Sequence, residues 1–301
     1  MKYNFDEIID RRGTESVKWD AVSERWGRND LLPMWVADMD FRTPSFVMNA
    51  LRKRLEHEVL GYTFACEEWY TSIINWLQSR HGWKVKREEL TFMPGIVRGL
   101  AFAIQCFTEK GDKVMVMPPV YHPFFLVTEK NKREVVYSPL VLRDGQYYID
   151  FDRFRKDIQG CKILILSNPH NPGGRVWTRE ELEKLGDICK KHGVIVVSDE
   201  IHADFVFEGK HQVFADLKPE YKDFTVICTS PGKTFNIAGL QASNILIPNE
   251  VLRETFAKQI TAAGYSQISA PGIEAVIAAY AQGEEWYQEM KKYVGENITF
   301  L

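Results

Sequence analysis

Residues 162–202 read KILILSNPHNPGGRVWTREELEKLGDICKKHGVIVVSDEIH, and this stretch decides the fold. Two short runs rich in Val, Ile and Leu, Lys162–Ser167 and Val194–Ser198, have the length and composition of buried strands. A helix is predicted between them, over Thr178–His192. Because a strand, a helix and a second strand follow one another closely, we expect an α/β domain with a largely parallel sheet.

The limits of the predicted helix are marked by capping residues. Thr178 and Glu181 have the spacing of a capping box, and Gly193 stands where a C-cap glycine belongs. The apolar residues of the helix fall on one face, which predicts that this face packs on the sheet. They are Leu182, Leu185, Ile188 and Cys189.

Further strands are expected on both sides of this unit, with helices covering both faces of the sheet. In sheets of this kind, ligands bind beyond the carboxyl ends of the strands, so the residues that follow each strand are the candidates for function. The additional apolar runs are Val114–Met117, Thr225–Thr229 and Asn244–Ile247.

Composition excludes several classes of protein. The 301 residues are 45% hydrophobic and 26% charged, and a net charge of −3 offers no electrostatic attraction to nucleic acid or to a membrane surface. No apolar run is long enough to span a bilayer, and the N-terminal residues lack a signal-peptide core. The five cysteines are dispersed, which is typical of reduced thiols in the cytoplasm, and no histidine spacing indicates a metal site.

Two of the predicted strands end in candidate polar groups. The turn SNPHNPGG after Lys162–Ser167 could direct the side chain of Asn171 at a ligand, although a plain tight turn has the same composition. Asp199 follows Val194–Ser198, and a carboxylate at the end of a buried strand requires a cation or a hydrogen-bond donor. A role as a helix N-cap is the alternative for Asp199.

The segment SPGKTFNIAGL follows Thr225–Thr229 and contains Lys233 in otherwise small and apolar surroundings. A desolvated lysine loses its proton readily and can react with a carbonyl group to form a Schiff base. The alternative is an ordinary solvated surface lysine. Ser230, three residues earlier, could bind a phosphate group.

Two weaker signals lie earlier in the chain. The turn at Gly95 opens an apolar helical stretch, so the backbone amides of Ile96 and Val97 are available for a phosphate. Tyr121 follows the strand Val114–Met117 and could stack on a planar ring, although a core tyrosine explains the residue as well.

In their order and spacing, these segments resemble the fold-type-I enzymes that depend on pyridoxal 5′-phosphate (PLP), the aspartate-aminotransferase superfamily. The resemblance implies a large PLP-binding domain with a mostly parallel sheet between helices, and a smaller second domain. It implies that Lys233 holds the cofactor as a Schiff base and moves the substrate proton. Asp199 would pair with the pyridine nitrogen, Asn171 with the phenolic oxygen, and Tyr121 would stack on the ring.

The resemblance also implies the surroundings of the phosphate and a homodimer with shared sites. The amides of Ile96 and Val97, together with Ser230, would hold the phosphate. Tyr62 matches a tyrosine that reaches the phosphate of the neighbouring subunit. His202 would lie near the phenolic oxygen, where most aminotransferases have a tyrosine.

Within the superfamily, the segment PMWVADMDF at residues 33–41 resembles the cystathionine β-lyase or C–S lyase branch, the MalY/PatB type. Ala37 and Asp38 in this segment are the candidates for contacts with the substrate. The implied reaction is β-elimination from cystathionine or another S-substituted cysteine, which yields pyruvate, ammonia and a thiol. An aminotransferase remains the alternative enzyme, and a regulatory binding protein of the same fold is a third reading.

The resemblance predicts how the chain divides into domains. Residues 1–48 would contribute to the small domain and the active site, residues 49–283 would form the large domain, and residues 284–301 would begin an interdomain helix. The rest of the small domain, with the arginine that binds the substrate carboxylate, is expected beyond residue 301.

Overall fold

The computed structural model describes residues 2–265 and 267–300. Its centre is a seven-stranded sheet in the order β1-β9-β8-β7-β6-β2-β3, in which β9 alone runs antiparallel to its neighbours. This arrangement confirms the predicted α/β fold with a largely parallel sheet. The strands are β1 (Leu90–Met93), β2 (Lys113–Val116), β3 (Glu134–Tyr137), β6 (Cys161–Ser167), β7 (Ile195–Asp199), β8 (Thr225–Thr229) and β9 (Ser243–Leu246).

The five strands expected from the sequence are present, with ends that shift by one residue at most. The predicted helix is α7 (Arg179–Lys191), and Thr178 forms the expected capping box with Glu181. Gly193 has a φ of 66°, the left-handed conformation that a glycine adopts at the lowest cost. Strands β1 and β3 and the hairpin of β4 (Val141–Arg143) and β5 (Gln146–Tyr148) were not predicted from the sequence.

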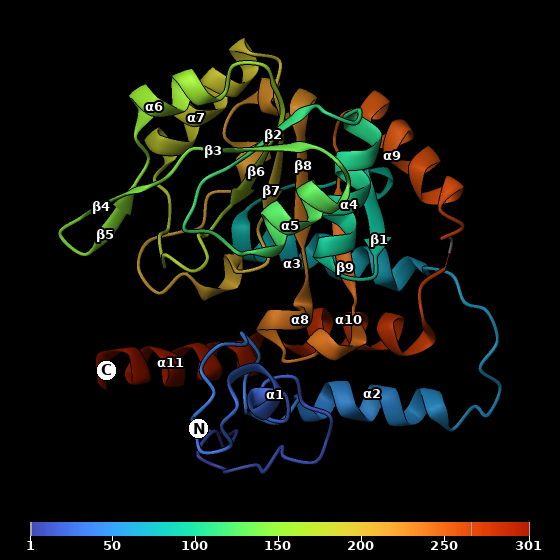
Figure 1. Cartoon of the computed structure of the whole chain (residues 1–301). Helices are drawn as coiled ribbons and strands as arrows, with labels where there is room; N and C mark the ends of the chain where they lie inside the picture. Colours follow the sequence, from blue (N-terminus) through green and yellow to red (C-terminus); the bar gives the residue numbers. More distant parts are fainter. Residues whose placement is uncertain (1, 266, 301) are drawn as a thin grey trace.

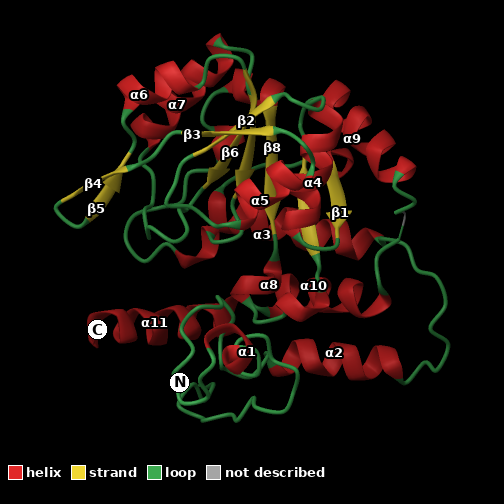
Figure 2. Ribbon diagram, in the orientation of Figure 1, coloured by secondary structure: helices red, strands yellow, loops and turns green. Residues whose placement is uncertain are grey.

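Alternate residues of the central strands face two separate hydrophobic cores, as the two-residue period of a strand requires. In β6, Ile163 and Ile165 belong to one core, whereas Leu164 and Leu166 belong to the other. Helices therefore cover both faces of the sheet (Figure 2). On one face lie α4 (Ile96–Phe107), α5 (Pro123–Lys130) and α9 (Glu250–Ala262), and on the other α3 (Glu67–His81), α6 (Phe151–Asp157), α7 and α10 (Ala270–Gln282).

Several helices and the N-terminal segment form a layer beyond one end of the sheet (Figure 1). These helices are α1 (Val22–Trp26), α2 (Ser45–Leu55), the single-turn α8 (Pro231–Thr234) and α11 (Glu284–Phe300), and α10 lies beside α8. The expected boundary after residue 48 falls inside α2, which packs on α10, so a division there would cut a helix. The division into domains otherwise stays a prediction. Within the described residues, no helix is both long and apolar enough to cross a membrane.

Candidate functional site

A cavity of about 420 Å³ opens at the carboxyl ends of the parallel strands, where the fold predicts a binding site. Its volume falls within the usual range for small-molecule pockets. Because β1, β2, β7 and β8 all end at this edge, residues far apart in sequence meet here. The predicted site residues that line the cavity are Ile96, Val97, Tyr121, Asp199, Ser230 and Lys233.

Lys233 is placed by the single helical turn α8, which directly follows β8. Ser230 caps this turn: its hydroxyl oxygen accepts the Gly232 N–H at 3.0 Å and the hydroxyl donates to the Ala242 carbonyl at 2.9 Å. The Lys233 ammonium donates to the carbonyl of Ala37 at 2.7 Å. Burial lowers the pKa of Lys233, so the neutral amine is more accessible than in a solvated lysine.

Asp199 is the last residue of β7 and is only 5% exposed. One carboxylate oxygen accepts the Ile201 N–H at 3.3 Å. Burial raises the pKa of Asp199 to about 7, and the charge of Glu200 adds to this effect, while Lys233 opposes it. A carboxyl group in this state is suited to pair with a cation that enters the cavity, because such a cation restores the charged form.

The raised pKa predicts a pH-dependent contribution of Asp199 to stability in the chain without ligands. Between about pH 4 and the folded-state pKa of about 7, the folded chain holds a proton that the unfolded chain has released. The stabilising contribution of Asp199 therefore falls as the pH rises through this range, and it is constant above it. We expect the unfolding free energy of the wild type, relative to Asp199→Asn, to fall by up to about 4 kcal/mol between pH 4 and pH 7.

Denaturant titrations of both proteins across this pH range measure that difference, and titrating groups that do not interact with Asp199 cancel in it. If the difference in unfolding free energy between the wild type and Asp199→Asn stays constant or grows with pH, Asp199 is ionised in the folded chain at acidic pH.

The remaining lining residues surround Lys233 and Asp199. Tyr121 is half-buried, and burial, with a smaller effect of the Asp199 charge, raises its pKa. Gly95, with a φ of 92°, turns the chain from β1 into α4, so that Ile96 and Val97 form the first turn of the helix at the cavity wall. Backbone N–H groups in the first turn of a helix have no partner within the helix and favour an anion.

The structure places the other five predicted residues outside the lining of this cavity, and they are Asn171, His202, Ala37, Tyr62 and Asp38. Asn171 contributes a backbone contact instead, since its carbonyl accepts the Tyr121 N–H at 3.1 Å. Burial lowers the pKa of His202 to about 4, with a further effect of the Lys233 charge. Ala37 reaches the site only through its carbonyl contact with Lys233. Tyr62 is 93% exposed on the loop between α2 and α3.

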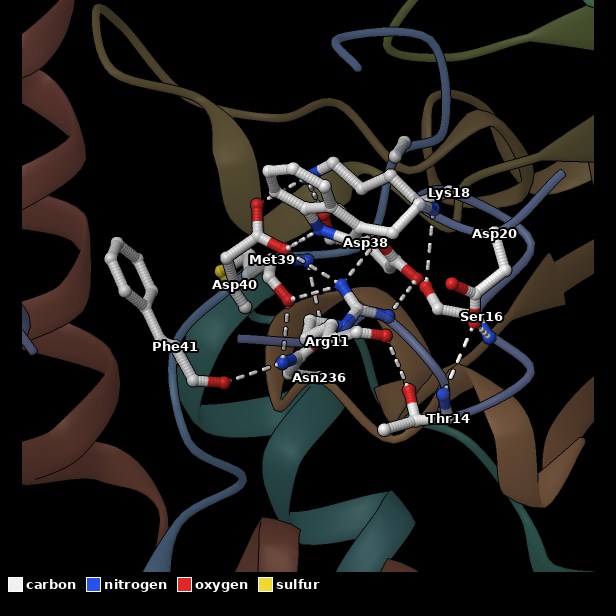
Figure 3. A network of polar contacts seen from close by, with 12 residues as sticks. Arg11, Thr14, Ser16, Lys18, Asp20, Asp38, Met39, Asp40, Phe41 and Asn236 are labelled. Atoms are coloured by element: carbon white, nitrogen blue, oxygen red, sulfur yellow. Dashed lines mark hydrogen bonds and ion pairs between the residues drawn. The ribbon is translucent and has the colours of Figure 1, made fainter. Parts of the chain in front are cut away.

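Asp38 lies in a second, wider groove of about 970 Å³, which shares Lys233 with the cavity. Figure 3 shows Arg11 between Asp38 and Asp40. The guanidinium binds both oxygens of Asp38, at 3.0 and 2.9 Å, and one oxygen of Asp40 at 2.8 Å. Lys18 contacts the other oxygen of Asp40 at 2.6 Å. These pairs hold the segment of Ala37 and Asp38 in one conformation beside Lys233.

Asn236 connects this segment to the loop of Lys233 through hydrogen bonds (Figure 3), and it was not among the residues predicted from the sequence. Its side-chain amide donates to the carbonyls of Met39 and Phe41, at 2.9 and 2.7 Å, and its side-chain oxygen accepts the Met39 N–H at 3.1 Å. Its position three residues after Lys233 was the only signal in the sequence that could have indicated it.

Arg98 and Gln241 form a further pair at the cavity wall that was not predicted. The Arg98 guanidinium donates to the side-chain oxygen of Gln241 at 2.7 Å and to the Pro94 carbonyl at 2.9 Å. Because both side chains line the cavity, a guanidinium is present on the side where α4 begins.

Comparison with known proteins places these features in one family. Residues 30–301 match the model of "Aminotransferase class I and II". The chain is 47% identical to "Cystathionine beta-lyase PatB" of Bacillus subtilis over 299 residues, which cover 98% of the chain and 77% of that protein. It is 32% identical to "Protein MalY" of Escherichia coli, over 99% of the chain and 77% of that protein.

Two solved structures agree with this result. Cystalysin from Treponema denticola, described as containing a pyridoxal 5′-phosphate cofactor, matches with a TM-score of 0.93 and 36% identity, over 97% of this chain and 75% of that one. The PLP-bound C–S lyase of Staphylococcus hominis matches with a TM-score of 0.92 and 41% identity, over 99% of this chain and 75% of that one.

Proposed function

The chain belongs to the class I and II aminotransferase family, and we propose that within this family it is a PLP-dependent C–S β-lyase. Its substrates are cystathionine or other S-substituted cysteines, and its products are pyruvate, ammonia and a thiol. The observation that carries the proposal is the 47% identity to a cystathionine β-lyase over nearly the whole chain. The two PLP-bound structures, a cystalysin and a C–S lyase, support the same chemistry.

The residues present fit this cofactor. The cavity brings together a desolvated lysine, a buried carboxyl group with a raised pKa, an aromatic ring and a helix start. In our proposal, Lys233 bonds the cofactor, Asp199 pairs with the pyridine nitrogen, and Tyr121 packs on the ring. The amides of Ile96 and Val97 hold the phosphate.

Ser230, Asn171 and His202 have supporting roles in this proposal. Ser230 lines the cavity and caps α8, so it positions Lys233 as well as facing the phosphate. Asn171 and His202 would contact the phenolic oxygen of the cofactor. The Asn171 carbonyl accepts the Tyr121 N–H, and the charge of Lys233 acts on His202, so both residues lie near the cavity.

When bound, PLP supplies an electron sink for the negative charge that develops at the substrate Cα. The carboxylate of Asp199 keeps a proton on the ring nitrogen, because the charged pair is more stable than a buried lone carboxylate. Lys233, with its lowered pKa, takes the proton from Cα as a neutral amine. Ala37 and Asp38 border the substrate side, since the Ala37 carbonyl contacts the Lys233 amine.

The decisive experiment measures pyruvate and free thiol released from cystathionine by the purified chain with added PLP. Pyruvate and thiol in equal amounts support the lyase. An aminotransferase, which the name of the family makes the second candidate, would instead transfer the amino group to an added 2-oxo acid without release of thiol. A regulatory binding protein would be favoured if the chain gave neither reaction and bound a protein partner that the Lys233→Ala variant still binds.

We also propose that the active form is a cytoplasmic homodimer with shared sites. Tyr62 and its neighbours Leu60 and Phe64 are 66–93% exposed on one loop, as a segment that reaches a second subunit requires. Sedimentation of the PLP-saturated chain is expected to give twice the mass of 34.9 kDa. Tyr62→Ala is expected to weaken PLP binding about 10-fold while the dimer persists, because one phosphate contact is lost. A PLP-saturated monomer would refute the shared site.

A further inference from the structure

The side of α8 that faces away from the cavity is anchored on a buried carboxylate, Asp204. This residue lies in the 3₁₀ turn Ala203–Phe205, directly after the segment that carries Asp199 and His202. Its carboxylate accepts the hydroxyl of Thr234 at 2.7 Å. Thr234 follows Lys233 in the chain and is 1% exposed, so the two side chains leave α8 in different directions.

Two residues of α3 complete the surroundings of this carboxylate. The indole N–H of Trp76 donates to Asp204 at 3.3 Å, and the Nε2 atom of His81 lies 3.4 Å from the other carboxylate oxygen. In α11, the hydroxyl of Tyr287 donates to the Asp204 backbone carbonyl at 2.6 Å. Asp204 therefore connects α3, α8 and α11 at one point behind Lys233.

The bond from Thr234 is the directional part of this anchor. Phe235, the next residue, is fully buried among Trp76, Tyr280 and Trp286, but such aromatic packing tolerates small rotations of the chain. A short hydrogen bond between a hydroxyl and a carboxylate depends strongly on distance and angle. The rotation of α8 about its axis, and with it the position of the Lys233 amine, thus depends on Thr234 and Asp204.

Burial by itself would raise the pKa of Asp204. The contacts with His81 and Thr234 outweigh this effect and hold the pKa below its ordinary value. A charged acceptor strengthens the bond from the Thr234 hydroxyl relative to a neutral one.

We propose that Thr234 and Asp204 are positioning residues, which set the place of the Lys233 amine relative to Asp199 across the cavity. Asp204 is suited to this role because its 3₁₀ turn follows Asp199, the last residue of β7, by only a few residues, while Thr234 belongs to the turn that carries Lys233. The inference rests on the proposed function, in which Lys233 condenses with the cofactor aldehyde, with loss of one water, and later moves the Cα proton.

The test compares Thr234→Val with Thr234→Ser. Valine keeps the shape and removes the hydroxyl, whereas serine keeps the hydroxyl. For valine we expect kcat on cystathionine to fall about 10- to 100-fold with KM within about threefold, because a misplaced group slows the reaction more than it weakens binding. We expect serine to remain within about threefold of the wild type.

The second readout requires no turnover. PLP is added to the apoprotein, borohydride fixes the cofactor at successive times, and mass spectrometry measures the fraction on Lys233. Capture by Thr234→Val is expected to slow by a factor similar to the fall in kcat. Thr225→Val is the matched control, since its buried hydroxyl donates to the Tyr221 carbonyl at the opposite end of β8, and we expect wild-type capture and kcat.

The inference would be overturned if Thr234→Val fixed PLP on Lys233 and turned over cystathionine at wild-type rates. It would also be overturned if the Thr225→Val control lost as much of both rates as Thr234→Val. If valine prevents folding, Thr234→Ala removes the same hydroxyl without a buried branched side chain and decides by the same criteria. A wild-type chain that fixes no cofactor on Lys233 overturns the proposed function and this inference with it. If the wild type fixes PLP on Lys233 and the Thr234 variants do so at the same rate and with the same kcat, only the inference about Thr234 and Asp204 is overturned.

Discussion

Lys233→Ala is expected to abolish covalent binding of PLP and to lower the rate of pyruvate release by a factor of about 10⁴ or more. The variant loses both the amine that bonds the cofactor and the base that takes the Cα proton, and a positioned base alone contributes about 10²–10⁴. The wild type should be yellow, and the variant should lack the absorbance of the bound cofactor. The measurements are absorption spectra, mass spectrometry after borohydride reduction and the pyruvate assay.

The control for this experiment is Lys222→Ala, which removes a solvent-exposed lysine just before β8. It is expected to behave as the wild type in all three measurements. Cofactor fixed by borohydride to a lysine other than Lys233 in the wild type would refute the assignment of the whole site.

For Asp199→Ala, we expect turnover to fall by a factor of about 10³ or more while part of the PLP binding remains. Loss of the carboxylate removes the partner of the protonated ring nitrogen, and with it the stabilisation of the charge that develops at Cα. Tyr121, Lys233 and the start of α4 remain in the cavity, so the cofactor keeps most of its contacts. Titration with PLP and the pyruvate assay measure the two effects separately.

Asp216→Ala is the matched control, since it removes an exposed carboxylate outside the cavity lining. Near-normal turnover in Asp199→Ala would exclude the proposed role of Asp199. A complete loss of PLP binding would show instead that the carboxylate is needed to assemble the site.

The sequence predicted the parts of the fold that local pattern determines. The strands with continuous apolar runs and α7 with its capping box were expected, because composition and caps are properties of short segments. The edge strand β3 and the β4–β5 hairpin are partly exposed and have no such run. The reversed direction of β9 depends on its pairing with β1 and β8, and no feature of the strand itself indicates that direction.

For the candidate site, too, the sequence predicted only what depends on local pattern. Residues that follow a strand, such as Asp199 and Lys233, could be predicted because the fold brings strand ends together. Asp204 and Asn236 could not, since their roles depend on donors and acceptors 30 to 197 residues away in the chain. For Asp199, the sequence did not reveal how far burial raises the pKa, which depends on the packing around the finished strand.

The hydrogen bonds between Asn236 and residues 39–41 have a consequence for the order of folding. The partners are about 200 residues apart, and residues 2 and 3 pair with Glu289 at a still larger separation. Contacts of such high sequence separation form late, because closing a long loop costs entropy before the contact stabilises it. We therefore expect residues 2–41 to be among the last to reach their native place, so that the contact between Ala37 and Lys233 forms late in folding.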